Sequence, residues 1–290
     1  MGQKRSHTGH WNERYGKNRQ VIRIYTRPSL HNSCKIIRVR HSTCFYSCPN
    51  GPIIKSKSPM GLYIMDSSLI WEHFYELSDT FPNLILIPKE NKFFIRGNIH
   101  FRAEHSSHES IEDEFLIEIE IPNTYPSVPP VARDLGERIP RSFHSFADGS
   151  FCLGAPLAVK MTFSNNPTLM GFVNSLLIPY LYSFSFQAKH KGKMPYGELS
   201  HGGNGLMDYY MRLFETKQPV SVLNFLVILA FRKYRGHSPC PCGSGNKLRS
   251  CHGPSLLELQ MYQTPEEFQS DLIDCHLFYK ENNKERKNNV

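Results

Sequence analysis

The stretch EFLIEIEIP, residues 114–122, decides the fold class. Apolar and acidic side chains alternate along it, so that the segment has two faces of opposite character. An alternation of period two is typical of a β-strand with one face in a core and the other in water. The prediction is an antiparallel strand whose core face consists of Phe115, Ile117, Ile119 and Ile121.

The segments before this strand predict a helix and a hairpin. Asp66-Ser67-Ser68 is a helix-capping sequence, and the amphipathic segment LIWEHFYEL follows it. The apolar run at 84–87 ends at Pro88, and a short turn leads into a second strand at 92–102. A helix followed by an antiparallel meander is therefore expected to open the folded part of the chain.

The segments after the strand are first irregular and then helical. The proline-rich stretch at 122–130 ends the sheet, because proline has no backbone N–H to donate. Helical patterns follow at about 167–187, 205–216 and 219–233. Strands followed by helices, rather than an alternation of the two, predict an α+β fold.

The positive charge of the chain is concentrated at its N-terminus. The sequence has 34 Lys and Arg against 26 Asp and Glu, a net charge of +8. Residues 1–60 hold 12 of the basic residues and one acid, whereas residues 61–290 hold 22 basic and 25 acidic residues. Nucleic-acid binding is therefore expected only through this basic arm, in which short apolar pieces such as 21–25 could form strands.

Composition bounds the class of protein. With 40% hydrophobic and 21% charged residues the chain can bury a core, and it is not a low-complexity disordered sequence. Eight cysteines without a visible secretory signal indicate a reducing compartment, which predicts a cytoplasmic protein. The uncharged stretch at 169–186 is long enough to span a membrane, but Asn174, Pro179 and three serines interrupt it. We expect a buried helix there and no membrane partner.

The segment CPCGSGNKLRSCHG, residues 240–253, has the composition of a metal site. Three thiolates and an imidazole form the soft donor set that Zn²⁺ takes tetrahedrally. Glycines at 243 and 245 let the backbone turn tightly between the ligand pairs. Four protein ligands leave no open position, so the prediction is a structural Zn²⁺ bound by Cys240, Cys242, Cys251 and His252.

The remaining cysteines carry weaker signals. A second zinc site is an alternative in the N-terminal arm, although a C-x3-C spacing alone is weak evidence; its ligands would be Cys34, Cys44, Cys48 and His41. Cys275 lies in a helix that opens with a capping-box pattern at 264–267, and it is expected to be a packing residue. The charged tail after that helix is expected to be solvated.

An ordered set of motifs resembles the ubiquitin-conjugating (E2) family: YPSVPP at 125–130, then His144, then GSFCL at 149–153. In that family a YPxxPP segment closes the meander, a His-Pro-Asn motif follows, and a Gly-x-x-Cys-Leu segment holds the thioester cysteine. The match covers about residues 66–215, and PYGELSHGGNGLMDYY at 195–210 is similar to the bacterial branch. The resemblance implies a UBC-like fold and a role beside ubiquitin-like conjugation systems, some of them in antiphage defence.

The resemblance implies that Cys152 is the acceptor thiol. A thiolate takes an acyl group as a thioester, and an amine then displaces it while donors stabilise the tetrahedral intermediate. Without the resemblance, Cys152 would be interpreted as a small buried hydrophobe between Phe151 and Leu153. His144 is expected to orient the loop by hydrogen bonds, and His201 to be either a turn residue or a wall of the active site.

The sequence departs from the family at one point. His144 is followed by Ser145-Phe146, so the asparagine of the His-Pro-Asn motif is missing. In the family that asparagine supports the oxyanion, a donor worth about 3 kcal/mol. The sequence leaves open which residue supplies this donor instead. The candidates are Asn165, Asn166 and His201.

The Cys/His segment at 240–253 resembles the SEC-C motif, the zinc module known from the tail of the SecA translocase. Lys247 and Arg249 give this zinc knuckle a basic face suited to a partner, which is a protein or RNA. The predicted organisation is therefore a basic arm at 1–62, a UBC-like domain at 63–234, the zinc motif at 236–254, and a helix with a charged tail at 255–290.

Together these patterns predict an E2-like transferase that carries a ubiquitin-like modifier on Cys152 and passes it to a lysine of a target protein. Its expected partners are an E1-like activating enzyme and either the modifier or the C-terminus of a cGAS-like nucleotidyltransferase. One alternative is an inactive E2 variant that only binds, and another is a thiol hydrolase using Cys152 with His144 or His201. A nucleic-acid binder built around the basic arm is a third alternative.

Overall fold

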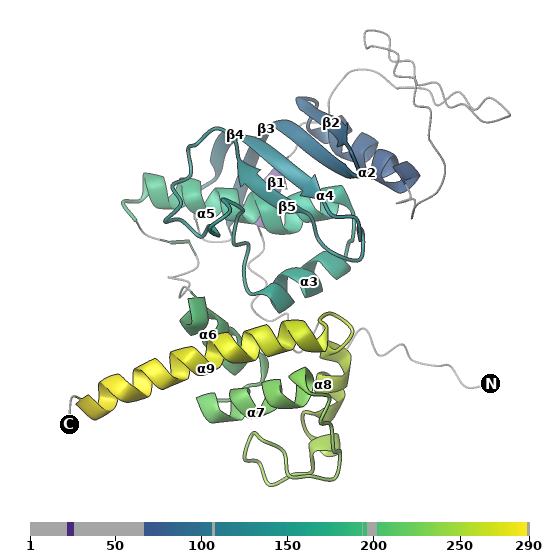
Figure 1. Cartoon of the computed structure of the whole chain (residues 1–290). Coiled ribbons are helices and arrows are strands. Elements are labelled where there is room, and N and C mark those ends of the chain that lie inside the picture. The colour runs from purple at the N-terminus through teal and green to yellow at the C-terminus, as the bar shows by residue number, and fades with distance from the viewer. Residues whose placement is uncertain (1–21, 26–66, 106–107, 193, 196–201, 289–290) are drawn as a thin grey trace, which may run out of the picture.

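A computed structural model describes residues 22–25, 67–105, 108–192, 194–195 and 202–288 of the chain. The described residues form an α+β structure in which a sheet with its helices lies beside a second group of helices (Figure 1). Their buried side chains fall into two hydrophobic clusters, which we call the sheet core and the helical core.

The sheet is an antiparallel meander, as the period-two pattern predicts. Its main strands are β2 (Leu84–Lys89), β3 (Lys92–His105), β4 (Ile111–Ile121) and β5 (Val131–Asp134). The core face of β4 is the expected one, since its four alternate apolar side chains are at most 1% exposed. On the other face, Glu118 and Glu120 pair with cations of the neighbouring strands, among them Arg96 and Arg133.

Helix α2 (Ser67–Thr80) precedes the meander and buries Ile70, Phe74 and Leu77. The chain then turns tightly into β2, and this turn needs a glycine on the adjacent strand. A Cβ at Gly97 of β3 would lie 2.0 Å from the carbonyl oxygen of Asn83, and the φ angle of Gly97 is +146°. Any other residue at position 97 would therefore force the turn away from the sheet.

The apolar stretch after residue 168 forms one continuous helix against the sheet. It comprises α4 (Leu169–Phe172), a π-helical turn η2 (Val173–Leu177) and α5 (Ile178–Lys189). The wider turn precedes Pro179, which cannot donate the hydrogen bond of a regular helix. This is a helix long and apolar enough to cross a membrane, and 72% of its most apolar window is buried inside the protein. The predicted burial of the segment is thus confirmed.

A short strand from the predicted basic arm adds to the sheet. β1 (Ile22–Tyr25) pairs antiparallel with the last residues of β3, in the register Ile22↔His105 to Tyr25↔Arg102. β2 pairs with the first residues of the same strand, so the 14 residues of β3 carry two different neighbours along one edge. The rest of the arm, including the alternative zinc ligands at 34–48, lies outside the described residues.

The helical core consists of α6 (Gly202–Leu213), α7 (Pro219–Ala230), α8 (Gly253–Leu259) and α9 (Pro265–Asn288). The boundary predicted near residue 234 groups α6 and α7 with the sheet. In the structure their buried side chains instead share a cluster with α8, α9 and Cys240. A polar contact also links these helices, because the Tyr210 hydroxyl of α6 donates to Asp271 of α9 at 2.6 Å.

Two predictions for the C-terminal helix are confirmed. The capping box is present, with the Thr264 N–H donating to Glu267 at 2.9 Å and the Glu267 N–H to the Thr264 hydroxyl at 3.3 Å. Cys275 is fully buried in the helical core, as expected for a packing residue.

Helix α3 (Pro156–Ser164) contributes to both cores and lies between the two groups in Figure 1. Its Phe163 is buried in the sheet core, whereas its Leu157 is buried in the helical core. Lys160 forms an ion pair with Glu267 of α9 across the same boundary. The loop that holds Cys152 runs directly into this helix, which places Cys152 beside the contact between the two cores.

Candidate functional site

Cys152 lies in a loop that the end of the sheet holds in place by main-chain hydrogen bonds. The Cys152 N–H donates to the carbonyl of His144 at 2.7 Å, and the Phe151 N–H donates to Ala132 of β5 at 2.9 Å. The Phe151 side chain is 5% exposed and anchors the loop in the sheet core. The Cys152 thiol is partly exposed, with its Sγ 4.0 Å from the carbonyl oxygen of Gly154. The loop thus presents a thiol on a fixed backbone.

The Asp148-Gly149 turn before the cysteine is tied by the Asp148 carboxylate. This carboxylate accepts from the Ser150 N–H at 3.0 Å and from the Ser150 hydroxyl at 2.6 Å, and it pairs with Arg133 of β5 at 3.0 Å. The bonds from Ser150, with help from Arg133, lower the pKa of Asp148 to about 2. Gly149 has a φ of +81°, which a glycine adopts without strain. The turn is therefore set by local polar groups.

Tyr180 of α5 supports the Cys152 loop with its hydroxyl and its ring. This residue was not identified from the sequence. Its hydroxyl donates to the carbonyl of Phe143 at 2.9 Å and approaches that of His144 at 3.3 Å. Its ring stacks on Phe151 with a centroid distance of 4.5 Å. Burial raises the pKa of Tyr180, so it stays a neutral donor. The only sequence signal was a tyrosine in a largely apolar stretch, which also holds other hydroxyl groups.

Of the two histidines predicted near the thiol, the structure describes His144 but not His201. His144 has a left-handed φ of +40°, and its carbonyl, rather than its ring, makes the bond to Cys152 described above. Its ring packs edge-on against Phe143 at 5.2 Å. Residue 144 thus holds the loop through its main chain, and the role of the His144 side chain stays a prediction. His201 lies outside the described residues, between Pro195 and the first residue of α6.

The candidate replacements for the missing asparagine are not beside Cys152 along the chain. Asn165 and Asn166 follow the last turn of α3, whose 9 residues extend about 13 Å along the helix axis. The Asn165 amide donates to the carbonyl of Met161 at 2.9 Å. The Asn166 side-chain oxygen accepts from Thr168 at 3.2 Å. Both amides therefore serve the end of α3 and the start of α4.

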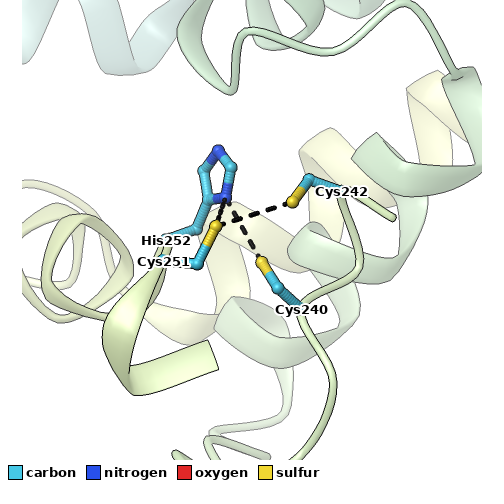
Figure 2. A group of neighbouring side chains, drawn as sticks. All are labelled: Cys240, Cys242, Cys251 and His252. Carbon is cyan, nitrogen blue, oxygen red and sulfur yellow. Dashed lines mark hydrogen bonds between the residues drawn. The ribbon is translucent and has the colours of Figure 1, made fainter. Parts of the chain in front are cut away.

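The four predicted metal ligands come together in the second site (Figure 2). Their ligand atoms all lie within 4.8 Å of one another. The shortest separations are 3.2 Å from Cys251 Sγ to His252 Nδ1, 3.3 Å from Cys240 Sγ to the same nitrogen, and 3.6 Å between the sulfurs of Cys242 and Cys251. Zinc bond lengths predict tetrahedral edges of about 3.8 Å between sulfurs and about 3.5 Å between sulfur and nitrogen. The cluster therefore has the donors and nearly the spacing to hold a metal ion.

The backbone around the cluster is a small antiparallel ribbon. Pro239 and Lys247 form a bridge, and the Cys240 N–H donates to Asn246 at 2.8 Å while the Leu248 N–H donates to Ser238 at 2.8 Å. This ribbon holds Cys240 and Cys242 on one side. The 3-10 turn η3 (Leu248–Ser250) then delivers Cys251 and His252 at the start of α8.

Neighbouring groups act on the individual ligands in different directions. The Nε2 of His252 lies 3.0 Å from the carbonyl oxygen of Phe214, just after α6, so an Nε2–H donates there and Nδ1 is left for the ion. Burial raises the pKa of Cys240 to about 11. For Cys242 burial opposes ionisation, but hydrogen bonds with Ser244, Cys240 and Cys251 together outweigh it and lower the pKa to about 6.

Comparisons of the chain with protein-family models, with curated proteins and with solved structures found no match.

Proposed function

We propose that the protein is an E2-like transferase that carries a ubiquitin-like modifier as a thioester on Cys152. The observation that carries this proposal is the partly exposed Cys152 thiol at the end of an antiparallel meander, on a loop fixed by main-chain bonds. Among the described cysteines, Cys275 is buried in the helical core and the other three belong to the metal cluster. Cys152 is thus the described thiol best placed for covalent chemistry.

The order of elements also supports the proposal. Helix α2, the meander β2 to β5, the segment YPSVPP, the Cys152 loop and then the long helix packed on the sheet follow one another. The resemblance to the ubiquitin-conjugating family implies this order. The finer assignment to a UBC-like fold is part of the proposal, as is the link to antiphage defence.

The proposed chemistry has two acyl transfers. The Cys152 sulfur attacks the activated carbonyl at the modifier's C-terminus, a C–S bond forms, and the bond to the activating enzyme breaks. A lysine amine of the target then attacks the thioester, so that a C–N bond forms, the C–S bond breaks, and the amine proton returns to the thiol. The partners would be an E1-like activating enzyme, the modifier or a partner C-terminus serving as one, and a target protein.

An inactive, binding-only variant is the second candidate. The observation that favours it is the position of Asn165 and Asn166 at the far end of α3, where they bond to other groups. If no donor replaces the missing asparagine, transfer to an amine would lose about 3 kcal/mol of transition-state stabilisation. His201 remains a candidate donor in the segment before α6.

We also propose that the metal cluster is a SEC-C zinc knuckle. Three thiols and one imidazole at tetrahedral spacing favour Zn²⁺, and four protein ligands leave it no open position for catalysis. Its role would be structural, because it fixes the ribbon at 235–249 onto the helical core. Recruitment of a partner through the basic face of the knuckle is part of the same proposal.

A lysine trap tests the proposed function. Cys152→Lys and Cys152→Ala proteins are expressed with the genomic neighbours of the gene, and their intact masses are compared under denaturing conditions. An added polypeptide on the lysine protein alone is expected, as a stable amide in place of the thioester. No adduct, with an active activating enzyme present, would favour the binding-only variant. Turnover of an activated ester by the purified protein alone would instead indicate the thiol hydrolase.

A further inference from the structure

The metal-binding region lies in a part of the chain that is free of acidic residues. Between Glu215 and Glu258 the sequence contains six Lys and Arg and no Asp or Glu. The charge count of residues 61–290 as a whole hides this imbalance, because acids elsewhere compensate it. A local run of one sign produces a local positive potential even where the domain as a whole is close to neutral.

The fold brings three of these cations, Arg235, Lys247 and Arg249, together on the ribbon that carries the metal ligands. The Arg249 N–H donates to the carbonyl of Gly236 at 2.9 Å, and Lys247 pairs with Pro239 in the bridge. Arg235 therefore lies next to the segment that carries Lys247 and Arg249. A Cβ at Gly236 would lie 3.1 Å from the Cβ of Arg249, which shows how closely the two segments approach.

These side chains are exposed and have no acidic partner among the described residues. Lys233, Arg235, Lys247 and Arg249 are all solvent-exposed, and none of them takes part in an ion pair within the part of the chain that the structure describes. Cations on the sheet behave differently, since Lys92, Arg96 and Arg133 are each paired with a glutamate. The positive charge on the ribbon is thus available to an external anion.

An exposed aromatic ring adjoins the cations. Phe231, at the end of α7, is 47% exposed, and the Lys233 ammonium lies 5.3 Å from the centre of its ring. Tyr234 instead packs against the ribbon, because its hydroxyl lies 3.3 Å from where a Cβ of Gly236 would be. A basic surface beside an accessible ring has the two elements that bind single-stranded nucleic acid, namely charge for phosphates and a face for a base.

We propose that this surface, made of Phe231, Lys233, Arg235, Lys247 and Arg249, binds single-stranded nucleic acid through its phosphate backbone. The arginines favour phosphate, because a guanidinium presents a fork of donors to its oxygens. An acidic protein segment would use the same charges but would gain less from the exposed ring. The proposal does not depend on thioester chemistry at Cys152, so either can fail alone.

Binding of fluorescein-labelled oligouridylate and oligothymidylate to the full-length, metal-loaded protein tests the proposal. Fluorescence anisotropy gives the dissociation constant at several salt concentrations. If about four phosphates are contacted, the logarithm of the affinity falls with the logarithm of salt with a slope of about −3. The double variant Lys247→Glu/Arg249→Glu is expected to bind at least tenfold more weakly and with a shallower slope. Phe231→Ala is expected to cost about tenfold through lost stacking.

A matched variant separates this surface from the overall positive charge. Lys89→Glu/Lys191→Glu changes the net charge by the same amount at two exposed positions on the sheet half, and it is expected to bind like the parent protein. Equal losses in both double variants would overturn the proposal, as would unchanged binding in the ribbon variant, which would point to the N-terminal arm. Complete displacement by an equal charge of polyglutamate, with no effect of Phe231→Ala, would also overturn it in favour of an acidic protein partner.

Discussion

The Cys152 loop and the Cys/His cluster are both built around cysteine, but different forces hold them. The Cys152 loop is anchored by Phe151 in the sheet core and by main-chain bonds to residues 132 and 144. The Cys/His cluster lies on a short ribbon with Cys240 and Leu248 as its buried side chains. The first site is therefore expected to survive without any ligand, whereas the second is expected to need a bound metal ion.

Metal removal is the change with the largest expected effect. Structural zinc in small modules contributes about 10 kcal/mol or more of binding free energy, so chelation or Cys251→Ser should disorder the ribbon and loosen α8. Hydrogen exchange is expected to rise across 236–259 and to stay unchanged in the sheet. Because the thiols bind as thiolates, metal affinity should fall as the pH falls.

Cys275→Ser is the matched control for metal removal. It changes a buried thiol of the same helical core but leaves the four ligands intact. Elemental analysis is expected to find one equivalent of metal in this variant and none in Cys251→Ser. Full metal content in both variants would contradict the assignment of the ligands.

The shared helix α3 offers a way to separate the two cores. Phe163→Ala removes a ring from the sheet core and should cost about 3–5 kcal/mol, and Leu157→Ala should cost about 2–5 kcal/mol in the helical core. Hydrogen exchange is expected to increase in β3 and β4 for the first variant and in α6 and α9 for the second. The same pattern in both variants would mean that the two cores unfold as one unit.

Tyr180→Phe should have a larger effect on the alkylation rate of Cys152 than on the free energy of unfolding. It keeps the ring on Phe151 but removes the hydroxyl that holds the carbonyls of residues 143 and 144, at a cost of about 1 kcal/mol. Alkylation of Cys152 by iodoacetamide, followed by peptide mass spectrometry, is expected to be about fivefold faster, because the loop opens more often.

Tyr182→Phe is the control on the same helix. Its hydroxyl donates to the carbonyl of Glu109 at 3.2 Å, and its side chain is buried, as that of Tyr180 is. The variant should lose a similar amount of stability without changing the alkylation of Cys152. Equal alkylation rates in the two variants would show that Tyr180 has no special role at the loop.

The smallest expected effect concerns the turn before Cys152. The folded pKa of Asp148, about 2, lies below its ordinary value, so the carboxylate adds stability above pH of about 4 and loses it as the pH falls toward 2. The carboxylate is 57% exposed, so solvent reduces the effect. The difference in unfolding free energy between the parent and Asp148→Asn should shrink over this range. Glu137→Gln, at an acid without an ion pair among the described residues, is the control for the loss of one exposed carboxylate.

The sequence predicted the parts of the molecule that depend on local patterns. The alternation in 114–122 predicted β4 with its correct core face, and the spacing in 240–253 predicted the four ligands. The grouping of α6 and α7 with α9 was not predicted, because an amphipathic pattern indicates that a helix buries one face but not which partner covers it. Tyr180 was missed for a similar reason, since its partners are carbonyls 36 and 37 residues away.

The hydrogen bond from His252 to Phe214 bears on whether the knuckle is a transplantable module. The motif at 240–253 reads as a self-contained unit, yet the group that sets the tautomer of its imidazole lies at position 214, outside the motif. The ring of His252 also packs 4.8 Å from Phe225 of α7. Grafted onto another protein, the short motif would bring its ligands but not this orientation, so α6 and α7 would have to travel with it.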